Sequence, residues 1–303
     1  MTKNGKPFGD LCGRVFVHSI SIIMTLLLLA NSFCTIGSWC IGIILAAIAA
    51  LGAKEFYTMA EIKSGHPKKT LGAVTVFIFL ILSFVSIRFF HYFPGELGKN
   101  LPWIFLIPIT GFLIFSFGSL ENSAVMNVGT TLFGILYLGV PLKLFFEILY
   151  GFNNPDLPKL GIWLTAYLIC VTKGADVFSY FFGKAFGKRK ISPVLSPKKT
   201  VVGLVCGLIG SGLIGMLFST VMSTYYKPLS FKSSSIIVLI AIILGFIGFL
   251  GDIAESIFKR DASVKDSYAF KAIGGVLDNL DSLLFASPVF YFILRIFDFF
   301  GLL

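Results

Sequence analysis

The stretch SIIVLIAIILGFIGFLGDIAESI, residues 235–257, begins as continuous hydrocarbon and ends with two acids. An apolar run of this length can cross a bilayer as a helix, which needs about 20 residues. On such a helix four polar residues stand at positions i, i+3, i+4 and i+7 and share one face: Asp252, Glu255, Ser256 and Lys259. Because charge is costly inside a bilayer, membrane proteins keep such groups for function. The stretch therefore predicts a membrane helix that carries part of a functional site.

The rest of the chain has the composition of a membrane protein. Of its 303 residues, 56% are hydrophobic and only 13% are charged, against roughly 25% charged in soluble domains. Further apolar runs lie near residues 15–36, 38–53, 71–93, 101–118, 125–150, 160–181, 201–222 and 282–300. Long continuous runs are typical of helices rather than of the alternating strands of a barrel. We predict an all-α, polytopic integral membrane protein with about nine transmembrane helices, the first of them retained rather than cleaved as a signal peptide.

Loop charges predict the orientation of these helices. Most of the 25 basic residues lie in the N-terminal tail or near residues 54–70, 182–200 and 258–281. Helices that alternate across the membrane place all these segments on one face, and basic loops face the cytoplasm. We therefore expect a cytoplasmic N-terminus in the cytoplasmic membrane. The net charge of +10 then reflects orientation and anionic lipid head groups, and no nucleic-acid partner is expected.

Intramembrane charge is distributed unevenly along the chain. Residues 1–120 are nearly free of it, whereas residues 121–303 hold almost all of it. We predict a single membrane domain, residues 1–303, in which residues 1–120 anchor the protein and residues 121–303 form the catalytic helices and cytoplasmic loops.

A second group of acids follows the opening stretch. Asp278 and Asp281 are three residues apart, so a helix would point them the same way, and Gly274-Gly275 before them can offer backbone N–H groups to an anion. Carboxylates that converge repel one another unless a cation lies between them, and oxygen ligands of this kind suit Mg²⁺. Three nearby bases complement phosphate oxygens: Lys259, Arg260 and Lys265. The alternative is a network of ion pairs between helices.

A third polar segment precedes residue 201. One acid, Asp176, is followed by a loop rich in Gly and Lys that ends in Ser196-Pro197-Lys198-Lys199-Thr200. Such a loop can hold a polyphosphate with backbone amides and lysines. The alternative is an ordinary basic loop on the cytoplasmic face.

These segments together resemble a known family. The signature of the phosphatidate cytidylyltransferases (CDP-diacylglycerol synthases) is similar to Ser256-Ile-Phe-Lys259-Arg260-x4-Lys265-Asp266 followed by Gly274-Gly275-Val-Leu-Asp278-x-x-Asp281. The loop that precedes this signature in the family resembles Asp176…Tyr180-Phe-Phe-Gly183-Lys-x-Phe186-Gly187-Lys188…Ser192-Pro193-x-x-Ser196-Pro197-x-Lys199-Thr200…Gly203. The resemblance covers about residues 170–292, and before it only a loose pattern that includes Glu55 is similar.

The resemblance implies an enzyme that makes CDP-diacylglycerol and pyrophosphate from CTP and phosphatidic acid. It implies that Asp252, Asp278 and Asp281 bind Mg²⁺, and it leaves open whether a second cation binds. The predicted catalytic residues that grip phosphate are Lys259, Arg260 and Lys265, with Asp266 orienting them. The predicted substrate-binding residues are Asp176, Ser196, Lys199, Ser256, Gly274 and Gly275. The partners would be both substrates and the bilayer, a homodimer is compatible with the sequence, and acyl-chain preference is undetermined.

The chain departs from the family pattern at three polar positions. Ile273 replaces a His, Asn279 replaces an Arg and Val202 replaces a Glu. These changes spare the predicted metal ligands but remove polar contacts, so they bear on rate, nucleotide affinity or substrate preference.

Other functions agree less well with the sequence. CDP-alcohol phosphotransferases need an Asp-Gly-x-x-Ala-Arg run that this chain lacks. Prenyltransferases need two separated Asp-rich motifs, and only Asp278-x-x-Asp281 resembles one. An ion- or proton-coupled transporter is the main alternative, but it predicts acids near the midplane and often repeated halves. A purely structural membrane protein does not account for the loop before residue 201.

Overall fold

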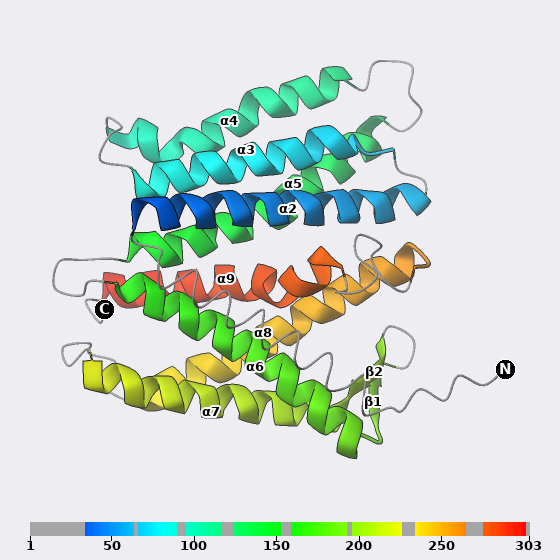
Figure 1. The fold of residues 1–303 in the computed structure, drawn as a ribbon. Coiled ribbons are helices and arrows are strands. Elements are labelled where there is room, and N and C mark those ends of the chain that lie inside the picture. The colour runs from blue at the N-terminus through cyan, green and yellow to red at the C-terminus, as the bar shows by residue number, and fades with distance from the viewer. Residues whose placement is uncertain are drawn as a thin grey trace.

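The computed structural model describes residues 34–63, 66–89, 95–116, 124–152, 159–192, 196–225, 234–264 and 275–300. Nearly all of the predicted first span lies outside these residues. So do four residues singled out above: Lys265, Asp266, Ile273 and Gly274. The described part is a bundle of long helices (Figure 1), which confirms the predicted all-α membrane class.

The described elements are eight helices and one short hairpin. In chain order they are α2 (Thr35–Lys63), α3 (Lys69–Arg88), α4 (Gly95–Ser116), α5 (Ala124–Gly151), α6 (Leu160–Phe186), β1 (Lys190–Ser192), β2 (Ser196–Thr200), α7 (Val201–Tyr225), α8 (Ser234–Asp261) and α9 (Val276–Phe299). Seven of the helices are long and apolar enough to cross a membrane, and α4 contributes a shorter apolar segment, Asn100–Ser116. The predicted second span, residues 38–53, is part of the longer α2.

Helix α9 lies between two groups of helices. It packs against α2 and α5 on one side and against α6 and α8 on the other, as Figure 1 shows. Its Phe290 is among the largest fully buried side chains, together with Tyr57, Phe79, Phe84 and Phe146 from the other helices. The interior is therefore continuous, and the site described below lies within it.

The outer surface is apolar. Large hydrophobic side chains such as Ile107, Phe115, Leu217 and Phe299 are more than half exposed. An apolar surface of this kind would promote aggregation in water but suits contact with lipid.

The loop between α6 and α7 contains the one element that the sequence did not suggest. β1 and β2 pair antiparallel, with Lys190 opposite Thr200 and Ser192 opposite Ser196. These strands are very short and carry Pro197 and several lysines, so no run of β-branched or aromatic residues announces them. The hairpin lies at the end of the bundle where α2, α4, α6 and α8 end (Figure 1), as the predicted alternation of loops requires.

Glycines in this segment allow helices to pack closely. A Cβ added to Gly203 of α7 would lie 3.2 Å from the Cα of Gly183 in α6 and 2.7 Å from the Ser179 carbonyl oxygen. The Gly203 N–H donates to Thr200 Oγ1 at 3.1 Å, which supports the start of α7. These two glycines thus join α6 to α7 at the base of the hairpin.

Candidate active site

Glycines on α8 bring its polar face against the neighbouring helices. A Cβ added to Gly251 would collide with the carbonyl oxygen of Asp281, and one added to Gly248 would lie 3.3 Å from Ser282 Cβ. Gly245 faces α7, where its Cβ would lie 2.7 Å from Ser211 Oγ. The three glycines therefore allow neighbouring helices to approach α8 closely.

Three acids meet where α8 and α9 approach. Carboxylate oxygens of Asp252, Glu255 and Asp281 all lie within 4.8 Å of one another. Glu255 is 2% exposed and Asp281 is 4% exposed, whereas Asp252 is half-buried. Asp252 and Glu255 share one face of α8, as their spacing in the sequence predicts. The close approach of α9 then brings Asp281 to them.

Lysines from α8 and β2 pair with the acids of this region. Lys259 on α8 lies 3.0 Å from Glu255 Oε1 and also forms an ion pair with Asp278. Lys199 on β2 lies 2.8 Å from Asp252 Oδ2. The hairpin therefore delivers a base to the acids of α8, and part of the ion-pair network considered as an alternative does exist.

A polar network continues from Asp281 into α6. Ser282 Oγ lies 2.9 Å from both Asp176 Oδ2 and Asp281 Oδ1, and its single hydroxyl proton can be donated to only one of them at a time. Lys173 Nζ lies 3.5 Å from Asp176 Oδ2 and 3.9 Å from Asp281 Oδ1. Asp176 is thus joined to the acid group through Ser282 and Lys173.

The other predicted residues that the structure describes lie on or next to the elements that carry these charged groups. Gly275 precedes the first turn of α9, and its N–H donates to Asp278 Oδ2 at 3.3 Å. Ser256 Oγ donates to the Asp252 backbone carbonyl at 2.9 Å. Ser196 pairs with its partner strand in the hairpin, and Arg260 is exposed at the end of α8.

Two of the three departures from the family pattern are also described. Asn279 Nδ2 donates to the Gly275 carbonyl at 3.2 Å, which supports the first turn of α9. Val202 is half-buried in the first turn of α7. Neither side chain contributes charge to the site.

Three residues of the cluster had no assigned role in the sequence-based site: Glu255, Ser282 and Lys173. Glu255 shares a helical face with Asp252, so its position was a usable signal. Lys173 stands three residues before Asp176 on α6, so that pair could be read from spacing. The contacts of Lys173 with Asp281 and of Ser282 with Asp176 depend on the approach of α6 and α9, which no spacing within either helix reveals.

The acid group fits a divalent cation of the magnesium type. Its donors are carboxylate oxygens, which Mg²⁺ prefers. Glu255 Oε1 is buried and accepts no hydrogen bond among the described residues, although Lys259 is near. Lys259 pairs with both Glu255 and Asp278, so Asp278 adjoins the group of three acids through this shared lysine.

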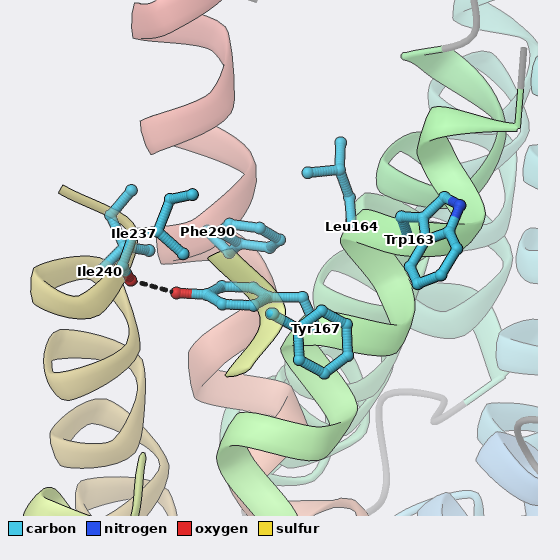
Figure 2. A pocket seen from close by; sticks show the side chains of 7 residues that line it. Trp163, Leu164, Tyr167, Ile237, Ile240 and Phe290 are labelled. Atoms are coloured by element: carbon cyan, nitrogen blue, oxygen red, sulfur yellow. Dashed lines mark hydrogen bonds between the residues drawn. The ribbon is translucent and has the colours of Figure 1, made fainter. Parts of the chain in front are cut away.

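An apolar pocket lies elsewhere in the bundle. Its lining comes from α6, α7, α8 and α9 (Figure 2): Trp163, Leu164, Tyr167, Phe218, Ile237, Ile240 and Phe290. Tyr167 Oη donates to the Ile237 carbonyl at 2.6 Å. Along α6, Tyr167 precedes Asp176 by about 13 Å at 1.5 Å per residue. A pocket without a charged residue does not suit phosphate groups, so it is not a candidate for the charged site predicted from the sequence.

Comparison with known proteins identifies the family of this chain. The family model described as "Cytidylyltransferase family" matches residues 14–297. The chain is 45% identical to a phosphatidate cytidylyltransferase of Chlamydia pneumoniae, over 95% of this chain and 93% of that protein. It is 41% identical to the one of Chlamydia trachomatis, with the same coverage. Identity to the one of Bacillus subtilis is 32%, over 68% of this chain and 80% of the relative. The chain belongs to the cytidylyltransferase family.

Proposed function

We propose that the protein is a phosphatidate cytidylyltransferase, which transfers CMP from CTP to phosphatidic acid and releases pyrophosphate. One structural observation carries this proposal beyond family membership. Acids from α8 and α9 interleave with lysines from α6, β2 and α8 at one end of a membrane bundle. Such a site can hold a cation and phosphate groups together. Nothing observed favours the alternative of an ion- or proton-coupled transporter.

The proposed reaction is a single displacement at phosphorus. An oxygen of the lipid phosphate forms a bond to the α-phosphorus of CTP. The bond from that phosphorus to the oxygen it shares with the β-phosphate breaks, and the oxygen leaves with pyrophosphate. Because the attacking oxygen is already anionic, the site needs no strong general base. Positioning and neutralisation of phosphate charge supply the catalysis.

We assign the cation to the acid group. Our sequence-based ligands are Asp252, Asp278 and Asp281, and the distances add Glu255. A bound Mg²⁺ would neutralise phosphate charge and polarise the oxygens that it contacts. The fold keeps the carboxylate oxygens of Asp252, Glu255 and Asp281 close together before substrate arrives. Lys259 limits the repulsion between Glu255 and Asp278.

The bases would bind the phosphates. Lys199 and Lys259 are already positioned by their ion pairs, so little reorganisation is needed when phosphate oxygens replace the carboxylates as partners. Arg260 and Lys265 are assigned to the same role, with Asp266 orienting them. Asp176, Ser196, Ser256, Gly274 and Gly275 would complete the substrate-binding walls.

We further propose that the site faces the cytoplasm from the cytoplasmic membrane. CTP would enter from the basic face, and phosphatidic acid would enter laterally between helices. The ends of α2, α6 and α8, which precede the basic segments predicted to be cytoplasmic, lie at the same end of the bundle as the start of α9, which supports this orientation (Figure 1).

A direct assay tests the reaction and the site together. Detergent-solubilised protein is incubated with radiolabelled CTP, phosphatidic acid and Mg²⁺, and the lipid product is counted. The variants Asp278→Asn and Glu255→Gln are compared with Glu147→Gln, which removes another membrane acid that is paired with Lys143 away from the cluster.

Each outcome of this assay has a definite meaning. We expect labelled lipid that requires Mg²⁺, is lost in both site variants and persists in Glu147→Gln. If folded protein forms no labelled lipid, the proposed reaction is wrong. If product forms normally with Asp278→Asn but fails with Glu255→Gln, Asp278 is not a ligand and Glu255 takes its place.

A further inference from the structure

A buried acid outside the cluster contacts the helix that carries Asp278 and Asp281. Glu55 on α2 is 7% exposed. Its Oε1 accepts a hydrogen bond from the Val276 N–H at 3.0 Å, and its Oε2 accepts one from the Leu277 N–H at 2.9 Å. Both carboxylate oxygens are therefore used on the first two residues of α9.

The start of α9 needs such a partner. The first N–H groups of a helix have no acceptor within the helix, and a side-chain oxygen just before the helix commonly binds one of them. The residue in that place is Gly275, which has no side chain. Asp278 binds the Gly275 N–H, so Glu55, from a helix far away in the sequence, serves the next two amides.

Neighbouring residues of α2 hold Glu55 in place. A Cβ added to Gly52 would lie 3.8 Å from Val276 Cγ1, so α2 runs close to α9 one turn before Glu55. The next residue, Phe56, packs its ring edge-on against Phe258 of α8 at a centroid distance of 5.7 Å. The same turn of α2 thus contacts both helices that supply the acid group.

We infer that Glu55 is a positioning residue, which fixes the first turn of α9 and through it the carboxylates of Asp278 and Asp281. A carboxylate is favourable at the positive end of a helix dipole, and its bonds to backbone N–H groups are strong. Asp278 lies in the first turn and Asp281 in the next, so a shift of this terminus displaces both acids. The consequence for metal binding rests on the proposed function, whereas the contact with α9 does not.

The test combines hydrogen exchange with a Mg²⁺ titration. Glu55→Gln keeps the shape of the side chain but removes its charge and one acceptor. Glu61→Gln is the matched control, because Glu61 lies on the same helix but is exposed and paired with Lys69. Amide exchange is measured by mass spectrometry on a peptide that spans the start of α9. Mg²⁺ dependence is measured both by product formation and by the rise in melting temperature.

We expect Glu55→Gln to accelerate exchange at Val276 and Leu277 and to raise the Mg²⁺ concentration for half-maximal effect about tenfold or more. That is the range found when residues that support metal ligands are replaced. Glu61→Gln should change neither measurement. Unchanged exchange in Glu55→Gln would overturn the contact, and faster exchange with an unchanged Mg²⁺ midpoint would reduce Glu55 to a purely structural role.

Two further arms separate the possible failures. If Glu55→Gln does not fold, Glu55→Asp retains the charge on a shorter side chain that cannot reach both amides equally well. Wild-type exchange and a wild-type Mg²⁺ midpoint in Glu55→Asp would also overturn the inference. If wild-type protein forms no CDP-diacylglycerol, the proposed function fails, while the exchange measurement still decides whether Glu55 holds α9.

Discussion

Replacement of Gly251 by alanine tests whether the distance between α8 and α9 controls the site. The new Cβ would lie 3.1 Å from the carbonyl carbon of Asp281 and 3.2 Å from Phe285 Cδ2, and nearer still to the Asp281 oxygen. Ordinary contacts between carbon atoms are about 3.5–4.0 Å. The partner is backbone that cannot rotate away, so α9 must move by roughly 0.5–1 Å.

This displacement predicts a larger effect on activity than on folding. Overpacking of a well-packed interior costs about 1–3 kcal/mol, which a stable bundle can tolerate. A misplacement of about 1 Å in catalytic groups can cost about 10²-fold in rate. Because Asp281 itself is displaced, we expect Gly251→Ala to lower kcat about tenfold to a hundredfold and to raise the Mg²⁺ requirement.

The assay is CDP-diacylglycerol formation across a range of Mg²⁺ concentrations, with the folded fraction measured by size-exclusion chromatography. Gly129→Ala is the control, because a Cβ added to Gly129 in α5 meets nothing within 4 Å. The control should retain wild-type activity. Wild-type kcat and Mg²⁺ midpoint in folded Gly251→Ala would refute the reasoning that close approach of α8 and α9 sets the acid geometry.

Three further substitutions test individual contacts. Lys259→Met leaves Glu255 and Asp278 without their shared base and should destabilise the protein by about 3–5 kcal/mol. The loss is measured as a lower thermal unfolding temperature, and an unchanged temperature would contradict the importance of these ion pairs. Lys199→Met should raise the KM for CTP at least about tenfold through loss of a charge-assisted contact, and a normal KM with low kcat would instead place Lys199 at a later step. Tyr57→Phe removes the buried hydrogen bond to the Thr131 carbonyl at 2.8 Å and should cost about 1 kcal/mol of stability with activity unchanged.

Much of the architecture followed from hydrophobic runs alone. A membrane-spanning segment satisfies its backbone hydrogen bonds within itself, so its length and hydrophobicity identify it without knowledge of its neighbours. The same local logic placed Asp252 and Glu255 on one face of α8. The hairpin was missed because its strands are short and lack a recognisable strand pattern.

The sequence by itself determined that the protein is a helical membrane protein, that its charge is concentrated in a few segments, and that these segments carry a cytidylyltransferase pattern. Only the tertiary structure decided which charges meet. It brought Asp281 to Asp252 and Glu255 and paired Lys259 with Asp278. It also placed Glu55, from the predicted anchoring segment of residues 1–120, on the first turn of α9. The physical reason is that helical periodicity relates residues within one helix. Contacts between helices depend instead on close packing at small residues such as Gly251, and the residues that meet there have no fixed separation along the chain.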